Sequence, residues 1–133
     1  MEFGPRALGH RSLLADPSQP NTVKKINEAV KNRDFWLPFA PSILEERFSD
    51  YCNDESKANR QFMTTATRST EMGQSDLRAA LHPYDLTARP QVVSANACPD
   101  YHALIKAFEA KTGIGGVLNT SLNMHGKPIV MNP

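Results

Sequence analysis

Residues 99–120 read PDYHALIKAFEAKTGIGGVLNT and join a predicted helix to a predicted buried strand. The helix is expected over residues 99–112, because apolar side chains recur there at helical spacing, namely Tyr101, Leu104, Ile105 and Phe108. Gly113 follows at the position where a helix end favours glycine, and the strand covers residues 116–120. A helix next to an apolar strand is typical of an α/β fold, here a mixed sheet with flanking helices.

Further elements are predicted on both sides of this unit. Strands are expected from composition at residues 12–15, 62–67, 87–94 and 129–131. Helices are expected at residues 22–31, with Asn21 as the N-cap, and at residues 45–51. Residues 35–44 are apolar but broken by prolines, which favours an extended segment or an edge strand. Residues 69–83 are predicted to form a mobile loop.

Length and charge limit the classes of protein that the chain can represent. The 133 residues suit one domain, and a net charge of +1 creates no global field for nucleic acid or an anionic membrane. No apolar run approaches the roughly 18 residues that a membrane span needs. Cys52 and Cys98 lack zinc-binding spacing, which favours reduced thiols in a cytoplasmic protein and leaves a single disulfide open. The abrupt ends of the sequence predict a fragment of a longer protein.

Two cationic motifs early in the chain could bind an anion. Residues 3–12, FGPRALGHRS, combine two glycines and a proline with Arg6 and Arg11, so backbone amides and guanidinium groups could hold a phosphate or a carboxylate. The alternative is an ordinary turn with surface arginines. Lys31 and Arg33 would point the same way on an extended segment and could face one anion. The alternative for this pair is a cationic helix end favoured by the helix dipole.

A third motif lies where the predicted strand 116–120 ends. Residues 118–128, LNTSLNMHGKP, place Asn119, Ser121 and Asn123 in a polar turn. Their hydroxyl and amide groups could bind a ligand, but hairpin turns use the same residue types.

The fourth candidate is Arg89, which lies in an otherwise apolar predicted strand. Such an arginine must either form a structural salt bridge or bind a ligand. His82 and Asp85 precede it at a spacing that allows a pair, although a solvated loop is the preferred interpretation. The four histidines show no metal-ligand spacing with carboxylates, so no metal site is predicted.

The order of these motifs is more specific than any one of them. The strings MEFGPRALGHRSLLADP, FAPSILEE, TARPQVV and LNTSLNMHGKPIV follow one another along the chain. Together they resemble the C-terminal region of the carbamoyltransferase family, which includes nodulation carbamoyltransferases and the enzymes that carbamoylate aminoglycoside and cephamycin antibiotics. The resemblance runs through nearly the whole chain and is thinnest across residues 50–80.

The resemblance implies a protein of two domains. Residues 1–133 would be part of the C-terminal domain, with a YrdC-like twisted mixed sheet, and they would join carbamoyl phosphate to ATP to form carbamoyl adenylate and pyrophosphate. An N-terminal ASKHA-like domain, absent from this chain, would hold an iron site and transfer the carbamoyl group to a hydroxyl acceptor. Mg²⁺ would accompany the nucleotide, and iron is expected only in the absent domain.

The resemblance also implies roles for single residues. Its Lys-x-Arg and Ser-x-Asn patterns fit Lys31, Arg33, Ser121 and Asn123, and catalytic roles are expected for Lys31, Arg33 and Ser121. Binding of ATP and carbamoyl phosphate is expected at Arg6, Arg11, Arg89, Asn119 and Asn123. Position 10 departs from the asparagine of many relatives, since it holds His10, which puts a ligand role for that side chain in doubt.

The expected partners are the two substrates and the N-terminal domain of the same protein, with no membrane. Two rival functions stay open. The chain could be a non-catalytic module that binds a nucleotide or docks on its partner domain, or a YrdC-like module that binds RNA. The near-zero net charge argues against nucleic acid. Formation of a homodimer is also left open.

Overall fold

The computed structural model describes residues 6–32, 34, 37–53 and 60–131. Its strands form a four-stranded sheet in the order β1-β7-β2-β6 and a three-stranded sheet in the order β3-β4-β5. The strands of the larger sheet are β1 (Ser12–Ala15), β7 (Gly116–Ser121), β2 (Ala40–Leu44) and β6 (Gln91–Val93). Those of the smaller sheet are β3 (Cys52–Asn53), β4 (Thr67–Ser69) and β5 (Thr87–Ala88). Among the described strands, β2 and β6 alone pair in parallel and the other pairs are antiparallel, so the predicted mixed α/β fold is confirmed.

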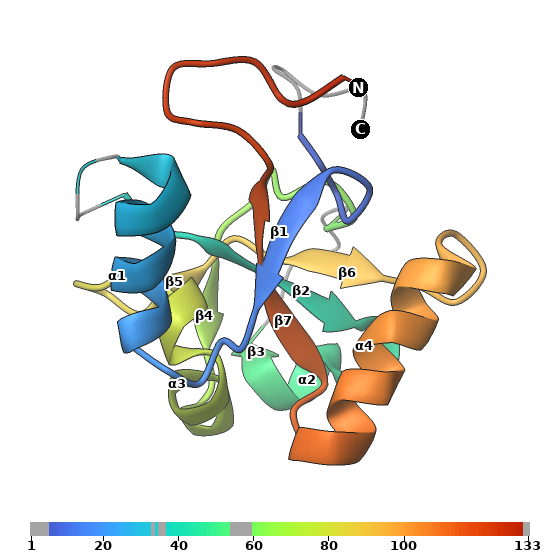
Figure 1. Ribbon diagram of the computed structural model, residues 1–133. Coiled ribbons are helices and arrows are strands. Elements are labelled where there is room, and N and C mark those ends of the chain that lie inside the picture. The colour runs from blue at the N-terminus through green and yellow to red at the C-terminus, as the bar shows by residue number, and fades with distance from the viewer. Residues whose placement is uncertain (1–5, 33, 35–36, 54–59, 132–133) are drawn as a thin grey trace.

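Helices flank the larger sheet, with α1 and α4 on opposite sides of it (Figure 1). The helical segments are α1 (Asn21–Ile26), η1 (Asn27–Lys31), η2 (Glu45–Arg47), α2 (Phe48–Tyr51), α3 (Glu71–Asp76), η3 (Arg78–Ala80) and α4 (Pro99–Thr112). The predicted helices at 22–31, 45–51 and 99–112 are therefore confirmed, with η1 wound as a π-helix. Asn21 is the first helical residue rather than the cap, since the N-cap is Pro20 and makes no side-chain hydrogen bond.

Successive side chains of β7 point to opposite faces of the larger sheet, and each face has its own part of the hydrophobic core. Val117 packs in a cluster with Tyr101 and Ile105 of α4, whereas Leu118 packs with Phe39 and with side chains of α1 and η3. Successive residues of a strand point to opposite faces, so each face receives its own helical cover. The predicted stripe on α4 is narrower than expected, because Leu104 is 47% exposed.

β2 lies at the centre of the larger sheet, so the predicted edge strand is wrong for the part of 35–44 that the structure describes. All five residues of β2 are buried between β7 and β6. The nitrogen of Leu44 donates to the carbonyl of Gly115 beside β7. By alternation, the nitrogen of Pro41 faces the side of β6, where pairing begins only at Ser42. The missing N–H of proline therefore costs the ladder no hydrogen bond.

The predicted strand 87–94 is two strands in the structure, separated by a segment that contains Pro90. Residues 87–88 belong to the smaller sheet and residues 91–93 to the larger one, with Arg89 and Pro90 crossing between them. The predicted strand 62–67 is wrong except for Thr67, because β4 starts there. Residues 129–131 form no strand either. Ile129 is nevertheless buried, within an irregular segment. An apolar residue at this position therefore reflects burial and not membership of a strand.

Residues 69–83, predicted to be a loop, instead contain α3 and η3. The hydroxyl oxygen of Thr70 accepts a hydrogen bond from the nitrogen of Gly73 at 3.0 Å and so caps α3. Leu77 and Leu81 are buried in the core between the two sheets. A single turn of helix carries too little periodicity to be seen in the sequence, and burial of these two leucines stabilises it.

Gly73 offers a test of this packing. A Cβ at this position would lie 2.2 Å from the carbonyl oxygen of Tyr51, which belongs to rigid backbone. We expect Gly73→Ala to lower the free energy of unfolding by about 2 kcal/mol or more, because α2 and α3 must separate. Ser75→Ala, at an exposed position of the same helix, is the control and should have little effect. Equal urea midpoints for both variants would contradict the close approach.

Candidate functional site

A small cavity lies at one end of the larger sheet, where β7 ends and β2 begins. The two strands are antiparallel, and Ala40 pairs with Asn119, so these ends meet. The cavity has a volume of about 130 Å³. Its described lining consists of Arg6, Ala7, Leu8, Pro38, Phe39, Ala40, Met63, Arg89, Asn119, Thr120 and Ser121. Four of the predicted site residues therefore line one cavity, although they lie up to 115 positions apart in the sequence (121 − 6 = 115).

Two arginines give this cavity its charge. Arg6 precedes β1, and Arg89 lies in the crossing between the two sheets. The protein atoms around the guanidinium of Arg89 lower its pKa, and the positive charge of Arg6 lowers that pKa further. The described lining contains no aspartate or glutamate, and no described carboxylate lies within ion-pair distance of Arg89. This arrangement favours an anion between the two arginines.

Beside the cavity, Lys31 meets two residues of the predicted strand-end motif. Its side chain is buried, and its Nζ donates to Asn123 Oδ1 at 2.7 Å and to Ser121 Oγ at 3.2 Å. It also donates to the carbonyl of Ser121. The hydroxyl of Ser121 in turn donates to Asn123 Oδ1 at 2.6 Å. Ser121 lines the cavity, so it connects this lysine cluster, Lys31–Ser121–Asn123, to the two arginines.

Local backbone structure explains why Lys31 reaches this position. Helix η1 ends at Lys31, because the C-cap residue Asn32 has a left-handed φ of 44°. The nitrogen of His125 donates to the carbonyl of Lys31 at 3.1 Å, which holds the turn after β7 against the helix end. The Lys31 part of the Lys-x-Arg motif thus lies against the Ser-x-Asn motif. Arg33 lies outside the described residues.

Asn119 forms part of the cavity wall and part of the interior. Its Nδ2 donates to Ser42 Oγ at 2.9 Å and to Gln91 Oε1 at 3.0 Å, and all three side chains are buried. The amide nitrogen of Asn119 is thus engaged inside the protein rather than offered to a ligand. Ser42 and Gln91 are not among the site residues predicted from the sequence. Each is a polar residue in an otherwise apolar strand, and a polar side chain buried in such a strand needs a hydrogen-bond partner. That feature of the sequence could have identified them.

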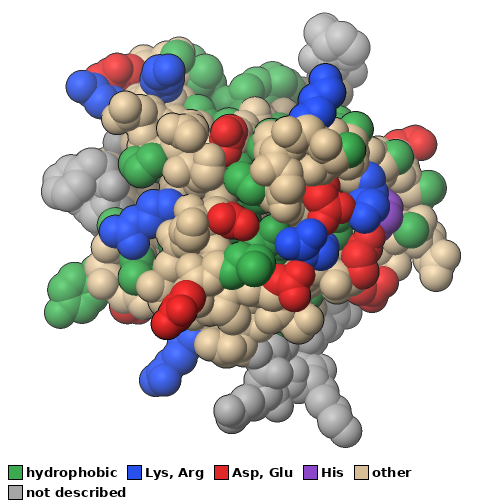
Figure 2. Space-filling model, turned by 90° about the horizontal axis from the view of Figure 1, so that it is seen from below, with side chains coloured by type: hydrophobic (Ala, Val, Ile, Leu, Met, Phe, Trp, Pro, Cys, Tyr) green, Lys and Arg blue, Asp and Glu red, His purple; other side chains and the backbone are tan. Residues whose placement is uncertain are grey.

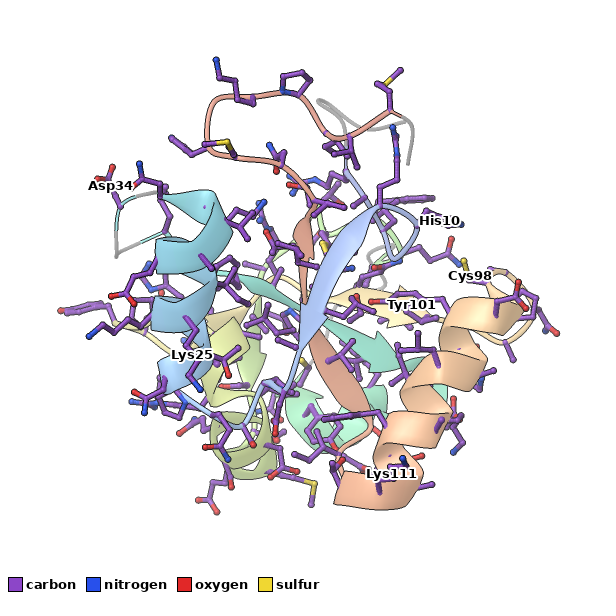
Figure 3. The ribbon with its side chains drawn as sticks, in the orientation of Figure 1. His10, Lys25, Asp34, Cys98, Tyr101 and Lys111 are labelled. Atoms are coloured by element: carbon purple, nitrogen blue, oxygen red, sulfur yellow. The ribbon has the colours of Figure 1, made fainter. Side chains whose placement is uncertain are left out.

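Arg11 lies apart from the cavity. Its guanidinium donates to the carbonyl of Val130 at 3.1 Å and contacts the sulfur of Met131, so it holds the segment after β7. Of the eight predicted site residues, the structure gathers six around the cavity and the lysine cluster, and it places Arg11 elsewhere. His10 is also elsewhere, on the side of the α4 N-terminus near Cys98 (Figure 3), where it lines a second cavity of about 320 Å³.

His82 and Asp85 do form a pair. His82 Nδ1 lies 3.1 Å from Asp85 Oδ1, although the approach is off the direction of a good hydrogen bond. The backbone N–H of Thr87 donates to the same carboxylate and is the main cause of its lowered pKa. His82 lines a further cavity of about 340 Å³ that shares Pro38, Phe39 and Arg89 with the first. The pair therefore adjoins the cationic cavity without entering it.

The face drawn in Figure 2 carries acidic and basic side chains side by side rather than a patch of one sign. Elsewhere in the chain, opposite charges are also paired, as where Lys106 Nζ lies 2.7 Å from Glu109 Oε2. Among the described residues there is no group of three His, Cys, Asp or Glu side chains that could hold a metal, and no helix is long and apolar enough to cross a membrane. Cys52 and Cys98 are not joined by a disulfide.

The sequence of the chain matches a known protein family. A family model described as carbamoyltransferase C-terminus matches residues 1–133. The chain belongs to this family. An uncharacterised protein of Methanocaldococcus jannaschii is 47% identical over 100% of the chain, which covers 21% of that relative. The nodulation protein NolNO of Sinorhizobium fredii is 43% identical over 97% of the chain and 19% of the relative.

A third relative has a named activity. The 3'-hydroxymethylcephem-O-carbamoyltransferase of Amycolatopsis lactamdurans is 36% identical over 97% of the chain, which covers 24% of the relative. The family resemblance inferred from the motifs is therefore confirmed. The chain spans about a fifth to a quarter of the length of these relatives, so it matches one region of each of those longer proteins.

Proposed function

We propose that the chain is the part of an O-carbamoyltransferase that activates carbamoyl phosphate with ATP to form carbamoyl adenylate. The observation that carries the proposal is the cavity that unites Arg6 and Arg89 with the lysine cluster. Both substrates carry several negative charges, and fixed cations offset their mutual repulsion. The O-carbamoyltransferase activity of the cephem relative supports carbamoyl chemistry in the longer protein.

The chemistry assigns distinct tasks to the two groups of cations. Carbamoyl phosphate first loses its phosphate to water, and the freed carbamate oxygen attacks the α-phosphorus of ATP while pyrophosphate leaves. Arg6 and Arg89 would bind the phosphate groups through their guanidinium forks. Lys31 would hold Ser121 and Asn123 so that their polar atoms orient the carbamoyl group or the triphosphate.

The size of the cavity limits what it holds. Small-molecule sites typically have volumes of about 300–1,000 Å³, whereas this cavity has about 130 Å³. We infer that it takes a phosphate-sized part of a ligand rather than a whole nucleotide. Its described lining offers no carboxylate, so Mg²⁺ would be bound mainly by the ATP phosphates and water, where it neutralises charge.

The rest of the reaction would belong to the longer polypeptide. We propose that an N-terminal ASKHA-like domain carries the iron site and transfers the carbamoyl group to a hydroxyl acceptor. The present chain would dock against that domain as a YrdC-like module. A cytoplasmic setting suits this function, because ATP is available there and cysteines without a disulfide, such as Cys52 and Cys98, persist in reducing conditions.

The test is ATP–pyrophosphate exchange catalysed by the full-length protein. We expect exchange of labelled pyrophosphate into ATP only when carbamoyl phosphate is present. Acetyl phosphate, which has the same phosphate group but no amide nitrogen, is the matched control and should support none. ATP binding without exchange would favour the non-catalytic nucleotide-binding or docking module instead. Salt-sensitive retention of RNA on a filter would favour the RNA-binding alternative.

A further inference from the structure

The cavity is covered on one side by a loop whose backbone is unusual. Residues 6–9, here called the Arg6 loop, supply Arg6, Ala7 and Leu8 to the lining. Leu8 has a φ of 49° and Gly9 a φ of 95°, so both lie in the left-handed region. Glycine adopts this conformation freely, but a leucine does so only where its surroundings impose it. Something outside the loop must therefore hold it.

Two contacts from outside the loop meet this requirement. Gln91, at the start of β6, donates through Nε2 to the carbonyl of Leu8 at 3.1 Å. Gly9 lies against the ring of Tyr101, which extends from α4 toward the sheet (Figure 3). A Cβ at Gly9 would be only 2.4 Å from Cδ1 of that ring, so the loop approaches as closely as glycine allows.

Gln91 is itself fixed in one orientation. Its side chain is buried, and its Oε1 accepts from Ser42 Oγ at 2.8 Å and from Asn119 Nδ2 at 3.0 Å. Because both donors occupy Oε1, the Nε2 end must face Leu8. The three side chains come from β2, β6 and β7, so the contact to the loop is anchored in the centre of the larger sheet.

We propose that Gln91 is a positioning residue, which fixes the Arg6 loop so that the guanidinium of Arg6 faces Arg89 across the cavity. The inference rests on the proposed function, because it concerns how the anion site is kept in shape before a ligand binds. Without the contact from Gln91, Leu8 would relax out of its left-handed conformation and Arg6 would move with it. A preorganised pair of cations loses less free energy on binding than a mobile pair.

The test compares two buried substitutions in the full-length protein. Gln91→Met keeps the size of the side chain but removes the donor to Leu8. Ile43→Val, on β2, is the control, since Ile43 packs in the core cluster around Tyr51 and Leu77, away from the cavity. We expect Gln91→Met to weaken binding of carbamoyl phosphate about tenfold, and Ile43→Val to change it less than about twofold.

Hydrogen exchange separates a positioning role from a merely structural one. The amide of His10 donates to the carbonyl of Ala7 and that of Gly9 to Ser12 Oγ, so both report on the loop. We expect Gln91→Met to speed exchange at these two amides while the amides of β7 stay protected. Unchanged exchange at Gly9 and His10 would overturn the proposal, whatever the stability of the variant.

A second variant covers the case in which Gln91→Met does not fold. Gly9→Ala disturbs the same loop from the side of Tyr101 and leaves the buried network intact, so it should weaken binding and speed exchange in the same direction. Full binding by Gly9→Ala would count against the proposal. If the wild-type protein binds neither carbamoyl phosphate nor ATP, the proposed function fails, and loop exchange in Gln91→Met still decides whether Gln91 holds the loop.

Discussion

Replacing Lys31 with methionine is expected to slow carbamoyl-phosphate-dependent ATP–pyrophosphate exchange by the full-length protein at least about 100-fold. Lys31 is buried, and its ammonium group binds both Ser121 and Asn123. Methionine retains the length of the side chain but offers no donor. The two polar side chains would then lose the group that orients them, and the positive charge beside the cavity would be lost as well.

The control for Lys31 lies on the same helical segment. Lys25 of α1 is exposed, so Lys25→Met removes one positive charge without touching the lysine cluster (Figure 3). We expect exchange activity of this variant within about twofold of the wild type. The unfolding midpoints of both variants show whether a loss of exchange activity comes from a loss of stability. A folded Lys31→Met protein with full activity would remove Lys31 from the site.

Arg89→Gln should weaken binding of carbamoyl phosphate about 10- to 100-fold, which is the range expected for loss of a hydrogen-bonded charge contact. The unliganded protein should not lose stability. Arg89 has no carboxylate within ion-pair distance among the described residues, and it shares the cavity with Arg6. Removing one of two neighbouring cations relieves repulsion, so the free energy of unfolding should stay the same or rise. Replacing a residue that serves binding often leaves the free energy of unfolding unchanged or raises it.

Arg68→Gln provides the matched control for Arg89. Arg68 lies on β4, is exposed, and does not belong to the described lining of the cavity. Its loss changes the net charge equally and should leave the dissociation constant nearly unchanged. Titrations at increasing salt add a second measure, because Arg89→Gln should flatten the salt dependence of binding. Equal affinity of Arg89→Gln and wild type would show that the cavity does not bind this ligand through Arg89.

Long or strongly patterned elements could be predicted from the sequence. The helix at 99–112 and the strand that follows it contain their own signals, namely apolar spacing, a glycine at the helix end and a β-branched or apolar run. Some short elements could not. α3 is six residues long, and β2 contains proline yet lies at the centre of a sheet. Their stability comes from burial against distant parts of the chain, and local propensity says little about that.

The sequence by itself determined which groups could bind an anion and which family the motif order resembles. It did not determine their arrangement. The meeting of Lys31 with Ser121 and Asn123, the shared cavity of Arg6 and Arg89, and the anchoring of Leu8 by Gln91 arise only in the folded chain. The hydrogen-bonded pairs among these residues lie up to 92 positions apart, and the pairing of β1, β2, β6 and β7 brings the segments that carry them together. Residue type is local information, whereas proximity depends on strand order and register.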